Sequence, residues 1–305
     1  MQLLVVNFHY YREASGQNGI YPRNRSQLIS QIDEMSRFYK FISQADLIEF
    51  LNGSIPLTGK FCLITFDDGL KEQMCALDEL NSLGVPAVFY INSAPIRDKT
   101  VTNVHKLHHL RAKISDGDLY SYVESVCERE ILFPDNIDSM YKYDDGPSRR
   151  IKYALNFGLS FEERTTVVNG LFDQLFDEKK LSHELYMSVE DLRKLSASGS
   201  LGNHTDQHLP LATLSKAAIT AEISGATDYF KSIGVNADHS ISYPFGGNAA
   251  VSDRVISCAS QYQFGLTMKR GLNDLVPHDD SRLSLMRVDT NDAPGGKYDR
   301  GDFSS

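Results

Sequence analysis

Two adjacent carboxylates follow an apolar run near the start of the chain. The run Leu63-Ile-Thr-Phe leads directly into Asp67, Asp68 and Gly69, which predicts a buried strand that ends in two acids and a tight turn. Two carboxylates in a low-dielectric setting are costly unless a cation meets them, and a divalent metal ion would serve. One acid could bind the metal while its neighbour accepts a proton from water. Alternatively, the pair caps a helix that begins near Leu70.

Two histidines stand four residues apart in Gly202-Asn-His204-Thr-Asp-Gln-His208. This spacing predicts that both imidazoles lie on one face of a helical turn, and it is a spacing found in metal sites. Such histidine pairs also occur on solvated helix faces. The presence of Asp67 and Asp68 elsewhere in the chain is what favours a metal site here. Two imidazole nitrogens and one carboxylate would leave open metal positions for water and substrate, which is typical of catalytic rather than structural zinc. The combination predicts metal-dependent hydrolysis.

A third element, Ile241-Ser-Tyr243-Pro244-Phe245-Gly246, reads as a strand that ends in a turn. Proline and glycine around an aromatic residue could point a backbone N–H into a site, where it would stabilise a developing oxyanion. An ordinary strand-end turn is the alternative. His9 ends the first predicted strand and would face the same edge of a barrel, although a histidine satisfied by its neighbours fits the pattern equally.

Short β-rich runs alternate with stretches of helical periodicity along the chain. Such alternation predicts βαβ units with parallel strands. The predicted strands are Leu3–Phe8, Phe61–Phe66, Ala87–Ile91, His239–Tyr243 and Phe264–Met268, and the predicted helices include Ser26–Tyr39, Leu70–Leu83, Ser215–Ile233 and one that starts at Ser188.

Size and composition limit the classes of protein that fit. The 305 residues suffice for one large α/β barrel or for two ordinary domains, and 41% of them are hydrophobic. A net charge of −9 disfavours nucleic acid as a partner. No apolar run approaches the roughly 18 residues of a spanning helix, so stable membrane insertion is not expected. The four cysteines form no CxxC pair and the start has no basic signal-like region, which predicts a reduced, cytoplasmic protein.

Residues from about 95 to 186 differ from the rest in composition, with a His-rich run, an acidic stretch and amphipathic helical patterns. We interpret them as a mostly helical insertion within a single domain that spans residues 1–305, and a small separate domain is the alternative. The insertion carries His105, His108 and His109, for which a solvated helical face is the preferred interpretation.

The three elements, in this order, resemble the polysaccharide deacetylase family, which comprises the carbohydrate esterases that include nodulation-factor and peptidoglycan deacetylases. Thr65-Phe-Asp-Asp-Gly69 is similar to its first motif, His204-Thr-Asp-Gln-His208 to its second and Tyr243-Pro-Phe-Gly246 to its third. The resemblance covers roughly residues 1–95 and 186–290. It implies a distorted (β/α)7-type barrel, to which the helical insertion is added.

The resemblance also implies a role for each matching residue. Asp67 matches the general base, Asp68, His204 and His208 match the metal ligands, and Phe245 matches the aromatic residue whose N–H binds the oxyanion. The metal would be zinc, with cobalt, nickel or manganese as alternatives. His9, Tyr243, Pro244 and Gly246 are the predicted substrate-binding residues.

Two departures from the family pattern concern protons and charge. Many members have an arginine beside the base in the third motif, where this chain has Ser242, so we expect Arg287 or Arg282 to take its place. The last motif normally supplies a histidine that protonates the leaving amine, but Arg287 occupies that position. Arg287 is therefore counted among the catalytic candidates, and His278 is a weaker candidate for the acid.

The leading functional hypothesis is hydrolysis of an N-acetyl group on an amino sugar, in a lipid-linked or nucleotide-linked precursor or another conjugate of surface polysaccharide. A deformylase or a sugar O-acetyl esterase would use the same metal. A barrel that binds carbohydrate without catalysis is the alternative from another class of protein, because the usual acid is missing.

Overall fold

The computed structural model describes residues 1–14, 16–127, 129–135, 137–140 and 145–304. These residues form two compact units. The first contains residues 1–14, 22–100 and 182–305, and the second contains residues 15–21 and 101–181. Among the described residues, no helix has both the length and the apolar character needed to cross a bilayer. The prediction of a single domain over residues 1–305 stays a prediction.

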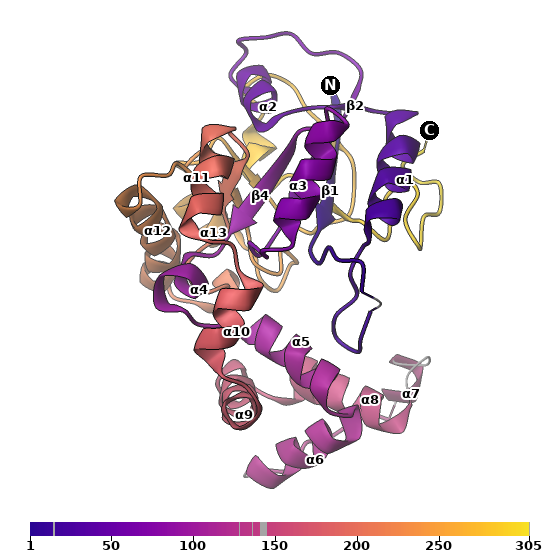
Figure 1. The fold of residues 1–305 in the computed structure, drawn as a ribbon, viewed down its shortest axis with the longest axis vertical. Coiled ribbons are helices and arrows are strands. Elements are labelled where there is room, and N and C mark those ends of the chain that lie inside the picture. Colours follow the sequence, from indigo (N-terminus) through magenta and orange to yellow (C-terminus); the bar gives the residue numbers. More distant parts are fainter. Residues whose placement is uncertain (15, 128, 136, 141–144, 305) are drawn as a thin grey trace. The chain divides into compact units, whose positions relative to one another are not determined.

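The first unit is built on a curled, mostly parallel sheet (Figure 1). Its strands follow the order β7-β6-β5-β4-β3-β1-β8, with β2 paired to β3 and β9 paired to β1. β8 runs antiparallel to β1, and the other pairs among the described strands are parallel. The strands are β1 (Gln2–Phe8), β2 (Lys40–Phe41), β3 (Lys60–Phe66), β4 (Ala87–Ile91), β5 (Leu201–Asn203), β6 (Ser240–Ser242), β7 (Phe264–Leu266), β8 (Asn273–Asp274) and β9 (Val288–Asp289).

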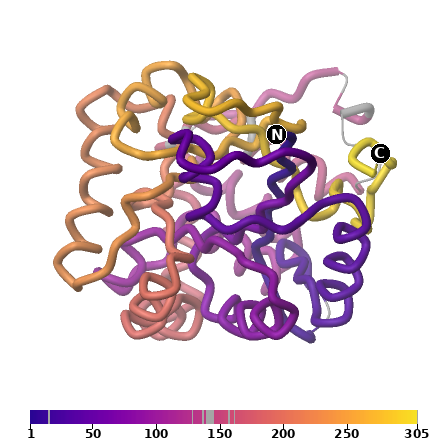
Figure 2. Tube along the Cα trace, turned by 90° about the horizontal axis from the view of Figure 1, so that it is seen from above, coloured from indigo at the N-terminus to yellow at the C-terminus, as the bar shows by residue number. Residues whose placement is uncertain are grey.

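One short segment near the end of the chain joins the two edges of this sheet. Leu285 forms a parallel bridge to Leu266 of β7, and Val288 of β9 pairs with Val6 of β1. In Figure 2 the indigo start of the chain accordingly lies beside the yellow C-terminal part. The segment 285–289 therefore closes the sheet into the distorted (β/α)7-type barrel that the sequence predicts.

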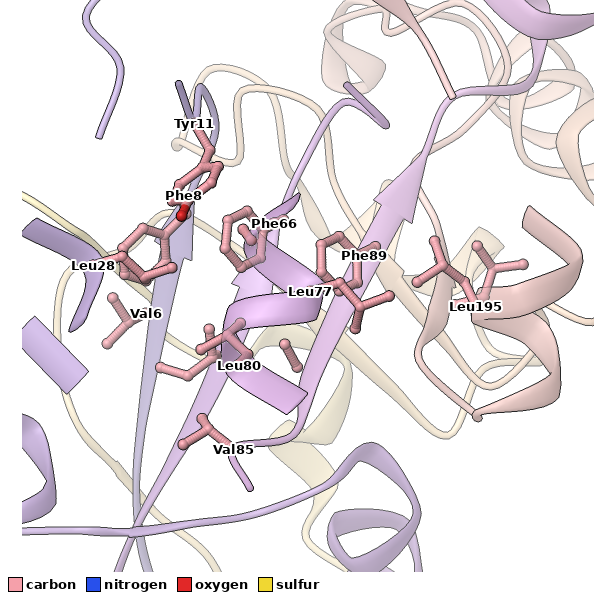
Figure 3. Packing of buried hydrophobic residues seen from close by; sticks show 14 of the residues in the cluster. Val6, Phe8, Tyr11, Leu28, Phe66, Leu77, Leu80, Val85, Phe89 and Leu195 are labelled. Carbon is pink, nitrogen blue, oxygen red and sulfur yellow. The ribbon is translucent and has the colours of Figure 1, made fainter. Parts of the chain in front are cut away.

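Alternate residues of each strand face opposite sides of the sheet, and this gives the unit two apolar layers. Leu4, Val6 and Phe8 of β1 belong to the layer beneath the helices, together with their counterparts on β3 and β4. The rings of Phe8, Phe66 and Phe89 stack in a row across these strands at centroid distances of 5.1 and 4.9 Å (Figure 3). Leu3 and Val5 belong to the other layer, which lines the barrel interior.

Two helices of this unit begin where the sequence predicts a helix start, at Ser188 and Ser215, whereas the cap of α1 at Asn24 precedes the predicted start at Ser26. Asn24 caps α1 and Ser188 caps α11, each in a capping box, and the hydroxyl of Ser215 caps α12. The helices are α1 (Arg25–Ser36), α2 (Gln44–Leu51), α3 (Gln73–Ser82), α4 (Ser93–Asp98), α11 (Val189–Ala197), α12 (Lys216–Ser232) and α13 (Asp253–Cys258), with short 3-10 turns at Leu211–Thr213 and Asp280–Ser284.

The second unit is helical where the structure describes it. Its elements are α5 (Asn103–Lys113), α6 (Asp116–Val126), α7 (Ile137–Met140), α8 (Gly146–Tyr153), a π-helical turn at Ala154–Gly158, α9 (Phe161–Leu175) and the first part of α10 (Glu178–Leu185). The predicted insertion at about 95–186 thus overlaps this unit, although residues 128, 136 and 141–144 lie outside the described part. The expected solvated face is wrong for His105, which is fully buried with its Nδ1 3.1 Å from the Thr102 hydroxyl.

Strand β5 shows what the sequence patterns miss. No strand is predicted at Gly202, yet this residue lies in the middle of β5, where an added Cβ would approach the Tyr90 ring to 2.3 Å. A glycine is required here because the neighbouring strand carries a buried tyrosine directly against the backbone.

Candidate active site

Polar side chains replace apolar ones where the barrel strands end. On β1 the interior positions Leu3 and Val5 are followed by Asn7, and beyond Leu63 on β3 the same alternation reaches Thr65 and Asp67. Ser242 ends β6 in a similar way and is fully buried. The barrel interior is therefore apolar towards the N-terminal ends of its strands and polar at their C-terminal ends, which is the usual location of a barrel active site.

Asp67 is surrounded by hydrogen-bond donors. The guanidinium of Arg287 donates from Nη1 to Oδ1 at 2.9 Å and from Nη2 to Oδ2 at 2.7 Å, which is the bidentate geometry of a strong ion pair. Asn7 Nδ2 and the Ser242 hydroxyl each donate to Oδ2 at 3.1 Å. Asp67 is 3% exposed and Arg287 is 1% exposed, so this is a buried ion pair with additional neutral donors.

Arg287 is held in turn by the groups around it. Its Nε donates to the Thr267 carbonyl at 3.2 Å, Nη1 to Asn7 Oδ1 at 3.1 Å, and Nη2 to the Ser242 hydroxyl at 2.9 Å. Burial would raise the pKa of Asp67, but the charges of Arg287 and then His204 outweigh it and hold that pKa below its ordinary value. The carboxylate is thus kept ionised and in one orientation.

Asp68 faces two imidazoles instead of an arginine. Its Oδ1 lies 3.5 Å from His204 Nε2 and 3.3 Å from His208 Nε2. One potential ligand atom from each of these three buried residues lies within 4.8 Å of the others, and the three are the one group of metal-binding type found among the described residues. The predicted metal ligands therefore meet at one point beside Asp67.

The hydrogen bond of His204 fits a metal ligand. Its Nδ1 lies 2.7 Å from the Ser242 carbonyl, which can only accept, so Nδ1 carries a proton, and Nε2, which faces Asp68, is the nitrogen that would bind a cation when the ring is neutral. Burial would lower the pKa of His204, but Asp67 and Asp68 outweigh it and raise that pKa. This corner of the site favours a positive charge, and the donor set fits a divalent cation such as zinc.

The loop that carries both histidines is not helical, so the predicted helical turn is wrong. His204 follows β5, and the 204–208 stretch bends with positive φ at Thr205 (67°) and His208 (60°), which brings the two imidazole centroids to 5.0 Å. Asp68 (φ 80°) and Phe245 (φ 61°) share this rare backbone region. Four of the six described non-glycine residues with positive φ thus lie at the site, where such strain commonly serves function.

The third predicted element forms the rim beside His208. The Phe245 ring meets the His208 ring edge-on at a centroid distance of 4.8 Å and stays 44% exposed. Pro244 is buried, and Gly246 has φ 60° where a Cβ would lie 2.6 Å from the Met268 nitrogen. The Tyr243 side chain points into the core, with its hydroxyl donating to the Leu283 carbonyl at 2.9 Å. Any contact of Tyr243 with substrate would therefore come from its backbone.

The remaining predicted residues differ in how close they lie to Asp67. His9 follows β1 and stays partly exposed, with its Nε2 3.5 Å from Asn7 Nδ2, so it lies one side chain away from Asp67. Arg282 instead donates to the Gln263 carbonyl at 3.0 Å. The backbone N–H of His278 donates to the Leu51 carbonyl, in the loop that follows β8, and β8 pairs with the start of β1, at the opposite end of the strands from Asp67.

The alternative interpretation of the acid pair, as a helix cap, is wrong. Helix α3 begins only at Gln73, its cap residue Glu72 makes no side-chain capping bond, and the Asp67 carboxylate is engaged by Arg287. Asn7 and the Ser242 hydroxyl were missed as partners of Asp67. The alternation of β1 could have indicated Asn7, because it continues the interior series of Leu3 and Val5 with an amide.

The family comparison bears directly on this geometry. The sequence pattern of the family described as polysaccharide deacetylase matches residues 140–267. The matched stretch contains His204, His208 and the Tyr243-Pro-Phe-Gly246 turn, begins inside the predicted insertion, and leaves Asp67, Asp68 and Arg287 outside. The family predicted from the three motifs is confirmed, and no curated protein matches the sequence.

Solved structures of deacetylases share the fold. IcaB from Ammonifex degensii is 17% identical, with 94% of this chain and 90% of that one covered and a TM-score of 0.55. A de-N-acetylase from Aggregatibacter actinomycetemcomitans is 14% identical with 95% of each chain covered and a TM-score of 0.55. The deacetylase PplD of Streptococcus pyogenes, solved with acetate, is 15% identical, with 95% and 92% covered and a TM-score of 0.52. At these identities the likeness concerns the fold.

Proposed function

We propose that this protein is a metal-dependent hydrolase that removes the N-acetyl group from an amino sugar within a saccharide. The observation that carries the proposal is the meeting of Asp68, His204 and His208 at one point, with Asp67 adjacent and held by Arg287. The match to polysaccharide deacetylases and the deacetylase folds support the same chemistry. The predicted lipid or nucleotide linkage of the substrate and the cytoplasmic location stay predictions.

In this proposal Asp68, His204 and His208 hold the cation, for which zinc is the first choice. A divalent cation there would lower the pKa of water and polarise the acyl carbonyl. Asp67 accepts the proton of the attacking water, because its carboxylate is ionised and its Oδ2 lies 3.9 Å from His204 Nε2. Arg287 cannot act as an acid near neutral pH, since a guanidinium stays protonated, and its role is to orient Asp67.

Phe245 supplies the remaining part of the proposed mechanism. Its left-handed backbone turns the chain sharply at the rim beside His208, and the proposed role of its N–H is to stabilise the oxyanion of the tetrahedral intermediate. Collapse of that intermediate breaks the C–N bond, and the proton that Asp67 took from the water passes to the leaving nitrogen, so that acetate and the neutral sugar amine are released.

The test is release of acetate from N-acetylhexosamine oligomers and conjugates by purified protein loaded with Zn²⁺ or Co²⁺. Asp67→Asn should lower the rate by about 10²–10⁴-fold, the usual contribution of a general base. Asp78→Asn, which changes an exposed acid on α3, is the matched control and should leave the rate unchanged. Mass spectrometry of the products separates acetate from formate and N-linked from O-linked release. A protein that binds zinc but releases no acyl group would contradict the proposal and favour a carbohydrate-binding barrel.

A further inference from the structure

Glu222 is a buried acid that the proposed mechanism does not use. It lies in the middle of α12 and is 5% exposed. Its side chain faces the loop that carries the two histidines, not solvent: Oε2 accepts a hydrogen bond from the Gln207 N–H at 2.9 Å, and its backbone carbonyl accepts from the Asp206 N–H at 3.1 Å. Two successive amides of the 204–208 loop are therefore bound by one residue.

The other side of the same loop is fixed by the start of α4. The Ser93 and Ala94 N–H groups donate to the Thr205 and Asp206 carbonyls at 3.2 and 3.0 Å. The carboxylate of Asp206 accepts from the Ser93 hydroxyl and from both Arg97 Nη atoms, at 2.7 Å for Nη1 and 3.1 Å for Nη2. The loop is thus held between two helices. Of these contacts, the one made by Glu222 is the nearest to His208, because it binds the N–H of the preceding residue, Gln207.

These contacts matter because the backbone of the loop is strained. Thr205 and His208 both have positive φ, a conformation that costs about 1–3 kcal/mol at each non-glycine residue and persists only when its surroundings impose it. The Gln207 N–H belongs to the peptide directly before the one that leads into His208. Fixing that amide sets the direction from which His208 Nε2 approaches Asp68 Oδ1, at 3.3 Å.

We infer that Glu222 is a positioning residue for the metal site, which acts by holding the Gln207 amide so that His208 can complete the ligand set. The inference rests on the proposed metal binding. What the role requires is an acceptor oxygen at the Glu222 position, and a negative charge is not needed. Burial is the main cause that raises the pKa of Glu222, and the adjacent Asp206 charge adds to it, so the carboxyl group takes up a proton more readily than an ordinary glutamate.

The experiment measures zinc affinity directly, by competition with a chromophoric chelator, on the whole chain of 305 residues. Glu222→Gln keeps an acceptor oxygen and should bind zinc within about threefold of the unchanged protein, since a lost hydrogen bond, not a lost charge, is what would weaken the site. Glu222→Ala removes the acceptor and should weaken zinc binding by about 10–100-fold, as for other residues that orient metal ligands. Asp228→Asn, an exposed acid on the same helix, is the control for the change of charge and should have no effect.

If Glu222 had a purely structural role, its replacement would lower the melting temperature of the metal-free protein, but zinc affinity would not depend on whether the new side chain keeps an acceptor oxygen. The melting temperature of each metal-free variant is therefore measured together with its zinc affinity. Should Glu222→Ala not fold, Glu222→Asp takes its place, because its shorter side chain keeps the charge but falls short of the Gln207 amide. Equal weakening in Glu222→Gln and the shortened variant, or no weakening in either, overturns the inference. Failure of the unchanged protein to bind zinc would instead overturn the proposed function.

Discussion

Asp67 and Asp68 are neighbours in sequence, are both buried, and have opposite surroundings. Asp67 meets a fixed positive charge and two neutral donors, all supplied by the chain. Asp68 meets two imidazoles that can each direct a lone pair at the same point. The difference shows how one pair of acids can serve two roles. The protein itself neutralises the first carboxylate, and in the proposed function a cation from solution neutralises the second.

The largest expected effect is on the Asp68 side. His208→Ala removes a nitrogen ligand, so zinc affinity should fall by more than about 100-fold, because loss of a group that merely orients a ligand already costs up to that much. Chelator competition measures this, and zinc-stimulated acetate release should disappear with it. Unchanged zinc affinity would show that His208 is not a ligand, and that Asp68 does not differ from Asp67 by belonging to a cation site.

The next effect concerns the ion pair on the Asp67 side. Arg287→Met should destabilise the protein by about 3–5 kcal/mol, because it leaves a buried carboxylate without its counter-charge. The double variant Asp67→Asn with Arg287→Met should recover much of this loss, since no buried charge then remains. Urea unfolding of the metal-free variants at neutral pH gives both values. Additive losses in the double variant would mean that the two side chains do not stabilise each other.

A smaller effect is expected where the two sides meet, at Ser242. Ser242→Ala removes a hydroxyl that donates to Asp67 and accepts from Arg287, and should cost about 1.5–3 kcal/mol of stability as a bond to a charged group. It leaves the backbone carbonyl that holds His204 Nδ1, so zinc affinity should stay the same. Isothermal titration with zinc and urea unfolding separate the two results. A parallel loss of zinc affinity would show that the two sides are coupled through this residue.

The smallest effect is expected for an exposed pair of the same chemistry in the helical unit. Arg129 Nη2 lies 2.8 Å from Glu163 Oε2 and, with the cap of α9, lowers the pKa of Glu163 to about 2. Arg129→Gln should raise that pKa towards the ordinary value of about 4.3, as followed by NMR titration. Because the pKa of Glu163 is lower in the folded state, the ion pair stabilises the folded protein at any pH above the ordinary glutamate pKa. This stabilisation is lost as the pH falls from that value towards 2. The variant should therefore lose pH dependence in that window while zinc binding is unaffected.

The sequence predicts the strongest parts of the barrel because their signals are local. The apolar runs of β1, β3 and β4 and the caps at Ser188 and Ser215 each depend on a few adjacent residues, and the structure contains them. Strand β5 was missed because one of its three residues is a glycine, which does not indicate a strand. The glycine is required because the Tyr90 ring on another strand leaves no room for a side chain there. Local patterns carry no information about such an approach.

The site divides in the same way. The residue types and the order of the three motifs selected Asp68, His204 and His208 as candidate metal ligands, and the structure brings these three together. The spacing of His204 and His208 suggested a helical turn, where the structure has a strained loop. The choice between Arg287 and Arg282 needed the closed barrel, because both lie far from Asp67 in sequence. The alternation of β1 could have placed Asn7 in the barrel interior, but its contact with Asp67 depends on the pairing of two strands. Glu222 gave no local signal, because its contact with the Gln207 amide depends on the packing of a loop against α12.

The barrel closure at residues 285–289 has a consequence for the order of folding. The partner that neutralises Asp67 is 220 positions later in the chain, on the segment that joins β7 to β1. During synthesis the acidic end of β3 therefore exists long before its arginine does, and it must stay hydrated until the last segment docks. Burial of the active site is thus a late, long-range step, and such contacts slow folding because a large loop must close first.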